Sequence, residues 1–453
     1  MTILTLGYFA KVLGQTWHGK DLLLEHPVKQ IVTDSRRVLP GDLFIAVPGA
    51  KVDGHDYIAE AKARGAIGAI VSRSLQTDLP TLLVSNTVIA LGEVAKAYRA
   101  QFSLPIMALT GSCGKTTVKE MTAFILQEAG KTLATQGNYN TEIGVPLTLL
   151  QLTRQHQRAV IELGARKKGD IHYLMEIVKP NITLITNAGA AHLEMFGSNQ
   201  GIAEAKGEIF SDLPFNGTAI INADDAAFEY WQGLLKPTQT LITFRLDNKA
   251  DVNIKKIRLE AAFSEFDCET TLGTFSVRLP VPGLHNVQNA AAAIAAALAF
   301  EVPLSAMKAG LERFIPVSGR LQYKAGAKGA LIIDDTYNAN PVSMKAAISV
   351  LSKYAGEKIL IMGDMLEIGL DTKALHGKMG EEAKQQGVQQ LFGFGMMSEN
   401  AINSFGEGAK HFTDKSRLIE SVLAALTNST TVLVKGSRGM RMEEVVQRLI
   451  ETH

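Results

Sequence analysis

A short glycine-rich segment that carries one lysine and two threonines offers the clearest chemistry in this sequence. It follows the apolar run Ile106–Leu109 and precedes Val118–Leu126, where apolar residues recur with helical spacing. A glycine turn between a strand and a helix gathers backbone N–H groups, and the helix dipole favours an anion there. We therefore predict that the segment binds the phosphates of ATP or a close relative. Its seven residues are Gly111, Ser112, Cys113, Gly114, Lys115, Thr116 and Thr117.

Two side chains at the end of this segment suit a nucleotide that carries a metal ion. Lys115 supplies positive charge for the β- and γ-phosphates, and the hydroxyl of Thr116 can bind Mg²⁺. The longer pattern G-x-x-x-x-G-K-[ST] is incomplete, because Leu109 stands where its first glycine would be. An ordinary turn between a strand and a helix is the alternative, and the elements on either side favour the phosphate site.

Two further polar residues follow predicted strands of the same region. Glu162 closes the apolar run Ala159–Ile161, and His192 comes after Ile182–Thr186. Because parallel strands end at one edge of a sheet, the pair predicts a cation site near the phosphates. Taken singly, Glu162 would be a solvated acid and His192 a hydrogen-bonding residue at a helix end. Lys206 has the pattern of an ordinary lysine on a surface helix.

Several polar loops are candidates for substrate contacts. Gly137–Gly144 is rich in turn-forming residues and is either a loop near the phosphates or a connector. Gly283–Asn289 opens an alanine-rich helix, where its Asn and His side chains would bind a nucleobase or cap the helix. Three further loops follow successive strands and predict a substrate or nucleotide surface. These loops are Asp334–Pro341, Gly363–Met365 and Lys435–Arg438.

The composition excludes some functional classes. Lys and Arg number 46 against 45 Asp and Glu, so no overall field favours nucleic acid or an anionic membrane. The longest apolar run, Ala290–Phe300, is too short to span a bilayer, and Met1–Gly7 lacks the basic start of a signal peptide. With only Cys113 and Cys268, no disulfide framework is expected. We therefore expect a cytoplasmic protein with no nucleic-acid partner and no membrane insertion.

The elements that must position these residues predict an α/β protein of three domains. Residues 1–104 form a small N-terminal α/β domain. Residues 105–317 alternate strands and helices, which is typical of a mostly parallel sheet, and 251–279 predicts an added antiparallel hairpin. Residues 318–453 repeat the alternation and predict a Rossmann-like domain. Candidate strands are Ile106–Thr110, Ala159–Leu163, Ile182–Thr186, Thr218–Asn222, Ala330–Asp334, Lys358–Met362, Gln390–Phe392 and Val432–Val434.

In this order along the chain, the motifs resemble the Mur ligase family, and the resemblance covers the whole sequence. Thr141 departs from the family, which often has a second asparagine there. The central domain would then be similar to a P-loop ATPase. The matching segments are Thr110–Thr117, Gly137–Pro146, Glu162, His192–Glu194, Ala205–Glu208, Gly283–Asn289, Gly319-Arg320 and Asp335–Pro341.

The resemblance implies ATP-dependent amide bond formation in peptidoglycan precursor synthesis. Tyr337–Pro341 and Lys435–Arg438 look like the family members that join D-alanyl-D-alanine to UDP-N-acetylmuramoyl-tripeptide. The Asp34–Arg36 pattern is shared by these members and the family members that add the third residue. The tripeptide carboxylate would attack the γ-phosphate to give an acyl phosphate and ADP. The dipeptide amine would then displace phosphate, giving UDP-N-acetylmuramoyl-pentapeptide. The third residue of the tripeptide, diaminopimelate or lysine, stays open.

The resemblance also implies roles in catalysis and metal binding. Lys115 would bind phosphate and act in catalysis, and Thr116 and Glu162 would hold one Mg²⁺. His192 would ligate a second Mg²⁺ that bridges the acyl phosphate. Lys206 would be carbamylated, which turns a cation into an anionic ligand of that second metal. We therefore expect two Mg²⁺ ions beside ATP.

The remaining roles divide the ligands among the three domains. Asn286 and Asn289 would contact adenine, while Arg320 and Asp335 would reach phosphate and ribose as the third domain closes around Ser318–Arg320. The first domain would bind the uridine diphosphate end of the substrate, and the third would bind the dipeptide. The substrate contacts would come from Ser35, Arg36, Asn338 and Asn340. The partners are then small molecules, and a monomer is expected.

Other functions share part of this pattern. Relatives that extend folate with glutamate or polymerise cyanophycin have the phosphate loop and the metal ligands, but lack an N-terminal domain of the Asp34–Arg36 type. A nucleotide-gated binding protein needs the loop but not Glu162, His192 and Lys206 together. A degenerate subunit that only binds is disfavoured because every expected catalytic position is filled.

Overall fold

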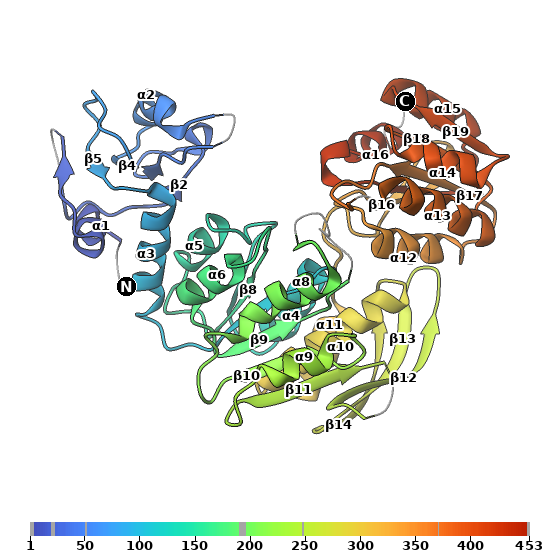
Figure 1. Ribbon diagram of the computed structural model, residues 1–453, viewed down its shortest axis with the longest axis horizontal. Coiled ribbons are helices and arrows are strands. Elements are labelled where there is room, and N and C mark those ends of the chain that lie inside the picture. Colours follow the sequence, from blue (N-terminus) through green and yellow to red (C-terminus); the bar gives the residue numbers. More distant parts are fainter. Residues whose placement is uncertain are drawn as a thin grey trace. The chain divides into compact units, whose positions relative to one another are not determined.

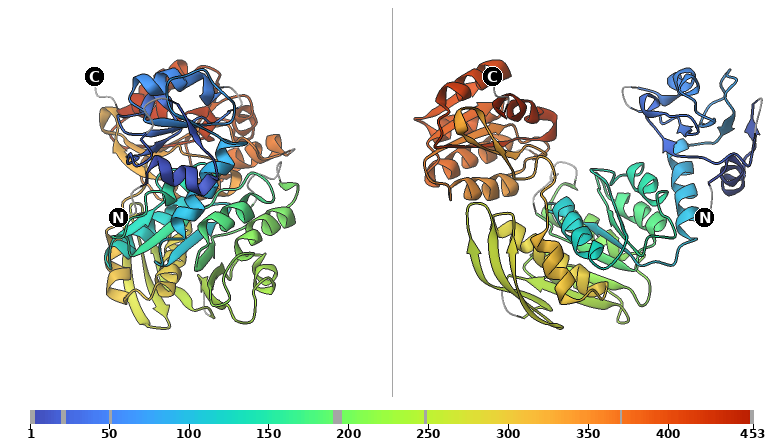
Figure 2. Two further views of the ribbon diagram at one scale, coloured as in Figure 1. Left: turned by 90° about the vertical axis from the view of Figure 1, so that its left-hand side faces the viewer. Right: turned by 180° about the vertical axis from the view of Figure 1, so that it is seen from behind.

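Helices and strands alternate along much of the chain of the computed structural model (Figures 1 and 2). The structure describes residues 4–19, 23–49, 52–189, 196–246, 249–369 and 371–450. The chain divides into two compact units. The first consists of Met1–Ala108, Lys131–Leu163 and His172–Pro180. The second consists of Leu109–Gly130, Gly164–Ile171 and Asn181–His453.

The N-terminal part of the first unit is built on a sheet of order β1-β5-β4-β3-β2, in which only β1 is antiparallel to its neighbour. Strands β3 and β4 are buried along their whole length, which is why they are continuous apolar runs. The α/β character predicted for residues 1–104 is confirmed. The strands are β1 (Trp17–His18), β2 (Ile31–Val32), β3 (Leu43–Ile45), β4 (Gly68–Val71) and β5 (Thr81–Leu83), and the helices are α1 (Leu6–Leu13), α2 (Ile58–Ala63) and α3 (Thr87–Arg99).

The rest of the first unit contains a parallel strand pair and short helices. Strands β7 (Thr132–Ala134) and β8 (Arg158–Glu162) run parallel, and β8 is the strand predicted at Ala159–Leu163. Helix α5 (Gly144–Leu149) follows the loop that starts at Gly137, and α6 (Asp170–Val178) lies mostly in this unit.

The central part of the second unit pairs its strands in the order β14-β13-β12-β11-β10-β9. Strands β9 to β12 are parallel, and β12 to β14 form an antiparallel meander, so the hairpin predicted in 251–279 is confirmed with one additional strand. Strand β6 (Ile106–Thr110) begins in the first unit and ends in the second. The other strands are β9 (Ile182–Ile185), β10 (Thr218–Asn222), β11 (Thr240–Arg245), β12 (Val252–Leu259), β13 (Ser264–Thr270) and β14 (Gly273–Leu279).

The helices of this central part position the candidate phosphate loop. Helix α10 (Leu284–Ala299) has a buried face made almost entirely of alanine, which allows α4 (Lys115–Gln127) to approach it closely. Helix α11 (Leu304–Glu312) packs against the same helix α4. The remaining helices are α8 (Asn199–Gly207) and α9 (Phe228–Gly233).

The C-terminal part of the second unit is a six-stranded sheet of order β15-β16-β20-β17-β18-β19, with β15 antiparallel and the rest parallel. Apolar clusters cover both faces, so this is the doubly wound arrangement that the sequence predicts. The strands are β15 (Gln322–Ala325), β16 (Leu331–Asp335), β17 (Glu357–Gly363), β18 (Gln390–Phe394), β19 (Ala409–Phe412) and β20 (Thr430–Lys435). The helices are α12 (Pro341–Leu351), α13 (Thr372–Gln385), α14 (Ser398–Phe405), α15 (Lys415–Ala425) and α16 (Glu443–Ile450).

The turn between β12 and β13 contacts this C-terminal sheet. The Ala261 carbonyl accepts hydrogen bonds from the hydroxyls of Tyr354 at 2.7 Å and Tyr323 at 3.3 Å. Burial raises the pKa of both phenols, so both remain protonated donors at neutral pH. In the described part of the chain, no helix is long and apolar enough to cross a membrane.

A glycine in α11 allows the close packing on α4, and this gives a first prediction. A Cβ at Gly310 would lie 2.4 Å from the Cα of Ile125. Because backbone cannot yield easily, Gly310→Ala should destabilise the protein by about 1–3 kcal/mol and lower the first thermal unfolding midpoint. Gly233→Ala is the matched control, since nothing lies within 4 Å of its Cβ position. Equal midpoints for both variants in scanning calorimetry would contradict the proposed close contact.

Candidate nucleotide and ligation site

The predicted phosphate loop lies between β6 and α4 and adopts a backbone that only glycine tolerates at two positions. Gly111 has a φ of +151° and Gly114, the residue before α4, has a φ of +81°. A Cβ at Gly111 would lie 1.9 Å from Thr186 Oγ1, and one at Gly114 would lie 2.3 Å from Asn289 Oδ1. The strand, turn and helix expected from the sequence are therefore all present.

Two residues at the end of β9 hold this loop in place. The Asn187 carbonyl accepts a hydrogen bond from Ser112 N at 2.9 Å, and its Oδ1 accepts one from Cys113 N at 3.0 Å. The Cys113 carbonyl accepts from Thr186 Oγ1 at 2.6 Å and from Asn187 Nδ2 at 3.0 Å. Asn187 was not among the predicted site residues, although its position directly after a predicted strand was a usable signal.

The loop has donors that suit an anion. Lys115 folds back over it, with Nζ 2.6 Å from the Gly111 carbonyl and 3.2 Å from that of Ser112. Ser112 Oγ is buried and has no hydrogen-bond partner within the described residues. An orphaned hydroxyl is unfavourable unless a ligand satisfies it. The cradle, the hydroxyl and the ammonium group together fit a bound phosphate.

Arg320 connects the phosphate loop with the C-terminal part of the chain. Its Nη2 donates to Thr116 Oγ1 at 3.0 Å, and its guanidinium lies 4.2 Å from the centre of the Tyr337 ring. The Nε of Arg320 is buried and has no partner among the residues that the structure describes. Arg320 thus retains an unused donor beside the loop, as expected for a residue that binds phosphate.

Helix α10 brings Asn286 and Asn289 to the same place. Asn289 reaches Gly114, and its Nδ2 donates to Asn286 Oδ1 at 3.3 Å. Asn286 is buried and donates to the Pro282 carbonyl at 2.8 Å. Gly283 occupies the N-cap position of α10, and no side chain caps the helix there. Helix capping therefore does not explain these two asparagines.

Lys206 is not the ordinary surface lysine that its local pattern indicates; that interpretation is wrong. Only 3% of the residue is exposed, and its Nζ lies 5.6 Å from the Phe196 ring centre. Burial, and next the charge of Lys115, lower its pKa to about 7, although Glu208 and Asp170 oppose the shift. A large share of this amine is therefore uncharged and nucleophilic at neutral pH.

In the first unit, Glu162 is buried rather than solvated. It ends β8 with 1% of its surface exposed, and its Oε1 accepts a hydrogen bond from Asn140 Nδ2 at 2.8 Å. The loop starting at Gly137 is thus more than a connector, because it holds this carboxylate. The neighbouring Tyr139 hydroxyl accepts from Arg37 Nη1 at 2.9 Å.

Ser35 and Arg36 make local contacts in the N-terminal sheet. Ser35 Oγ donates to Glu60 Oε2 at 2.7 Å. The exposed Arg36 forms two hydrogen bonds with Asp34, at 2.9 and 2.8 Å, and lowers the pKa of that carboxyl. Their predicted contact with a substrate stays a prediction.

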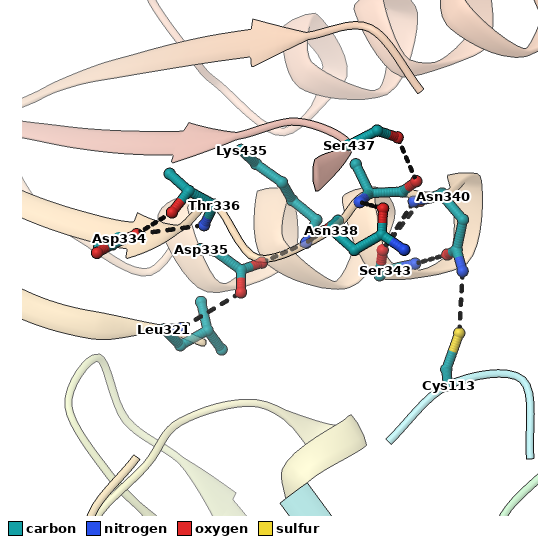
Figure 3. A network of polar contacts seen from close by, with 11 residues as sticks. Cys113, Leu321, Asp334, Asp335, Thr336, Asn338, Asn340, Ser343, Lys435 and Ser437 are labelled. Carbon is teal, nitrogen blue, oxygen red and sulfur yellow. Dashed lines mark hydrogen bonds and ion pairs between the residues drawn. The ribbon is translucent and has the colours of Figure 1, made fainter. Parts of the chain in front are cut away.

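The loops after β16, β17 and β20 meet at one edge of the C-terminal sheet, as predicted. Figure 3 shows the contacts between the loops after β16 and β20. Lys435 Nζ lies 2.6 Å from Asp335 Oδ2 and donates to the Asn338 carbonyl at 2.9 Å. Asp335 Oδ1 also accepts from Leu321 N at 3.2 Å. Ser437 N donates to the Asp364 carbonyl at 3.0 Å, which joins the third loop. The role of Lys435 itself was missed, although its segment was recognised.

His285 lies in the electrostatic field of this ion pair. Burial lowers the pKa of His285 to about 4; the Asp335 carboxylate opposes the shift, and the Lys435 ammonium adds to it. The imidazole is therefore neutral at physiological pH. It can serve there as both a hydrogen-bond donor and an acceptor.

The structure describes some, but not all, of the residues that the family resemblance implies as magnesium ligands. Thr116 Oγ1 and the Glu162 carboxylate are buried oxygens, the donor type that Mg²⁺ prefers. No cluster of three His, Cys, Asp or Glu side chains that could hold a metal occurs within the described ranges. His192 lies outside these ranges.

Comparison with known proteins places this arrangement in a family. The Mur ligase family catalytic domain matches residues 27–108, the Mur ligase middle domain matches 109–297, and the Mur ligase glutamate ligase domain matches 319–438. The chain belongs to the Mur ligase family.

The individual relatives share one activity in their names. The chain is 43% identical, over 100% of its length and 99% of the relative's, to the UDP-N-acetylmuramoyl-tripeptide–D-alanyl-D-alanine ligase of Escherichia coli K12. A crystal structure of MurF from Acinetobacter baumannii matches with a TM-score of 0.92 and 36% identity, with full coverage of both chains. MurF ligase from Thermotoga maritima in complex with ADP matches with a TM-score of 0.81 and 28% identity, covering 93% of this chain and 97% of that one.

The environment of Lys206 gives a second prediction. In protein carrying ¹³Cε-lysine and kept free of bicarbonate, NMR should show one lysine with a pKa of about 7. Lys115→Met should raise that pKa, because it removes a positive neighbour. Lys168→Met is the control, since Lys168 is exposed and pairs with Glu204. If every lysine titrates at its usual pH, burial does not lower the pKa of Lys206. An unchanged pKa in Lys115→Met would show that the charge coupling is absent.

Proposed function

We propose that the protein joins D-alanyl-D-alanine to UDP-N-acetylmuramoyl-tripeptide with hydrolysis of ATP to ADP and phosphate. The observation that carries this proposal is the phosphate loop, where Lys115 and the orphaned Ser112 hydroxyl face an anion-binding cradle. The full-length similarity to the Escherichia coli ligase supports the choice of substrates. The Thermotoga maritima complex supports the choice of nucleotide.

The proposed reaction has two balanced steps. A carboxylate oxygen of the tripeptide attacks the γ-phosphorus of ATP, forming an acyl phosphate as the bond to ADP breaks. The uncharged amine of D-alanyl-D-alanine attacks the acyl carbon, phosphate leaves, and the amine loses its proton. Both steps require neutralisation of phosphate charge and alignment of the reacting atoms. Lys115 and Arg320 supply the positive charge from fixed positions around the loop.

Magnesium would neutralise further phosphate charge when bound. Thr116 and Glu162 are its proposed ligands, with His192 and a carbamylated Lys206 proposed for a second ion. The pKa of about 7 at Lys206 supports carbamylation, because only the uncharged amine attacks carbon dioxide. The proposed cofactors are thus ATP and two Mg²⁺ ions.

The other proposed contacts follow the division into domains 1–104, 105–317 and 318–453. Asn286 and Asn289 would bind adenine, and Asp335 would bind ribose. Ser35 and Arg36 would contact the uridine diphosphate end of the substrate. Asn338 and Asn340 lie on the same loop and would contact the dipeptide. Asn338 is exposed, and its Nδ2 has no partner within the described residues. The free cysteines support a reducing compartment, and we propose a cytoplasmic monomer acting on small molecules.

The decisive experiment measures ADP release by the purified protein with Mg-ATP and UDP-N-acetylmuramoyl-tripeptide, with and without D-alanyl-D-alanine. Release that requires both substrates is expected. Turnover only with glutamate and a folate acceptor would overturn the substrate assignment. ATP binding without turnover on any acceptor would favour a nucleotide-gated binding protein.

A third prediction concerns the loop lysine. Lys115→Ala should lower kcat by about 100- to 1,000-fold, because a preorganised charge on the transferring phosphate is lost. Lys131→Ala is the matched control, since Lys131 is an exposed lysine whose Nζ donates to Gln155 Oε1. Steady-state ADP release distinguishes the two, and equal rates would remove Lys115 from the proposed chemistry.

A fourth prediction concerns carbamylation. With ¹³C-bicarbonate above pH 7, a carbamate ¹³C resonance should appear and should be absent from Lys206→Gln. As the pH falls below the lysine pKa of about 7, the signal should decline, because the protonated amine does not react. A resonance that persists in Lys206→Gln would assign the carbamate to another amine.

A further inference from the structure

Residues 336–340, called here the crossing loop, connect β16 with α12. Hydrogen bonds hold three successive residues of this loop. The Asn338 carbonyl accepts from Lys435 Nζ at 2.9 Å, and the Ala339 carbonyl accepts from Ser437 Oγ at 3.2 Å. Asn340 N donates to Ser343 Oγ at 3.1 Å. Because these three consecutive residues are all anchored, a displacement of Asn340 would also displace Asn338 (Figure 3).

The side chain of Asn340 uses its two polar ends differently. Its Oδ1 accepts from Ser343 N at 2.8 Å and completes a capping box at the start of α12. Its Nδ2 points the opposite way and donates to Cys113 Sγ at 3.1 Å (Figure 3). The cap fixes the orientation of the amide, so the N–H group is aimed at the phosphate loop.

Cys113 is equally well fixed on its side of the contact. Its backbone N donates to Asn187, and its backbone O accepts from Asn187 and Thr186, so the backbone that carries the thiol is fixed to the residues after β9. The contact thus joins two rigid segments.

We propose that Cys113 and Asn340 are positioning residues that couple the phosphate loop to the crossing loop. This inference rests on the proposed function, in which the first loop binds ATP and the second faces the dipeptide. The contact sets where Asn338 lies relative to the γ-phosphate. It therefore aligns the dipeptide amine with the acyl phosphate, while binding of ATP itself depends on other groups.

The test uses variants that remove the contact and preserve the helix cap. Asn340→Ser keeps a capping residue at α12 and is too short to reach Cys113. Cys113→Ala removes the acceptor, and Cys113→Ser restores one. Asn86→Ser, at the cap of α3, and Cys268→Ala, at the other cysteine, are matched controls. Thermal midpoints show whether any variant is merely unstable.

Cys113→Ala and Asn340→Ser should each raise the KM for D-alanyl-D-alanine by about fivefold, the effect of losing one modest hydrogen bond, with the KM for ATP nearly unchanged. The double variant should be no worse than either single variant, because both remove the same interaction. Cys113→Ser should recover most of the loss. The controls should match the wild type.

Three results would overturn the inference. These are parallel rises in the KM values for ATP and dipeptide, additive losses in the double variant, or variants indistinguishable from the wild type. An inactive wild-type protein would instead overturn the proposed function, and the coupling with it. Wild-type turnover and the ratios between variants thus separate the two failures.

Discussion

The hydrogen bonds from Thr186 and Asn187 to the phosphate loop determine where the other groups of the site can lie. They fix the backbone at Ser112 and Cys113, while the positive φ angles of Gly111 and Gly114 turn the chain into α4. The close approaches at both glycines leave no room for a side chain. Lys115, Thr116 and Asn289 take their positions from this backbone, so a small change in it would displace all three.

Positive charge accumulates around this loop before any ligand is bound. Lys115 and Arg320 contact it directly, and Lys206 is close enough for Lys115 to depress its pKa. A buried cation beside another cation is unfavourable, and Lys206 responds by releasing its proton more readily. Away from the loop, Asp335 and Lys435 neutralise each other, and His285 stays uncharged. Positive charge thus lies beside the place where phosphates would bind.

Much of this arrangement could be predicted from the sequence, because its signals are local. The strand–turn–helix at Gly111–Lys115 and the central strands of each sheet are marked by apolar runs and glycine spacing. Strands β15 and β19 were not predicted, since they are partly exposed and lack such runs. The burial of Lys206 and Glu162 depends on segments distant in the sequence, and no local pattern reveals it. Asn187, by contrast, directly follows a predicted strand, a signal that could have identified it. The placement of His192 stays a prediction.

The two tyrosine hydroxyls that share the Ala261 carbonyl have a consequence for the evolution of chain length. One backbone atom in the β12–β13 turn accepts from Tyr323, in β15, and from Tyr354, in the segment between α12 and β17. A residue inserted into or deleted from that turn would shift the atom by roughly one residue length, about 3.3 Å. Tyr323 could not follow this shift from its place in β15. The turn thus acts as a spacer of defined length, and surface exposure alone would overestimate its tolerance to insertion and deletion.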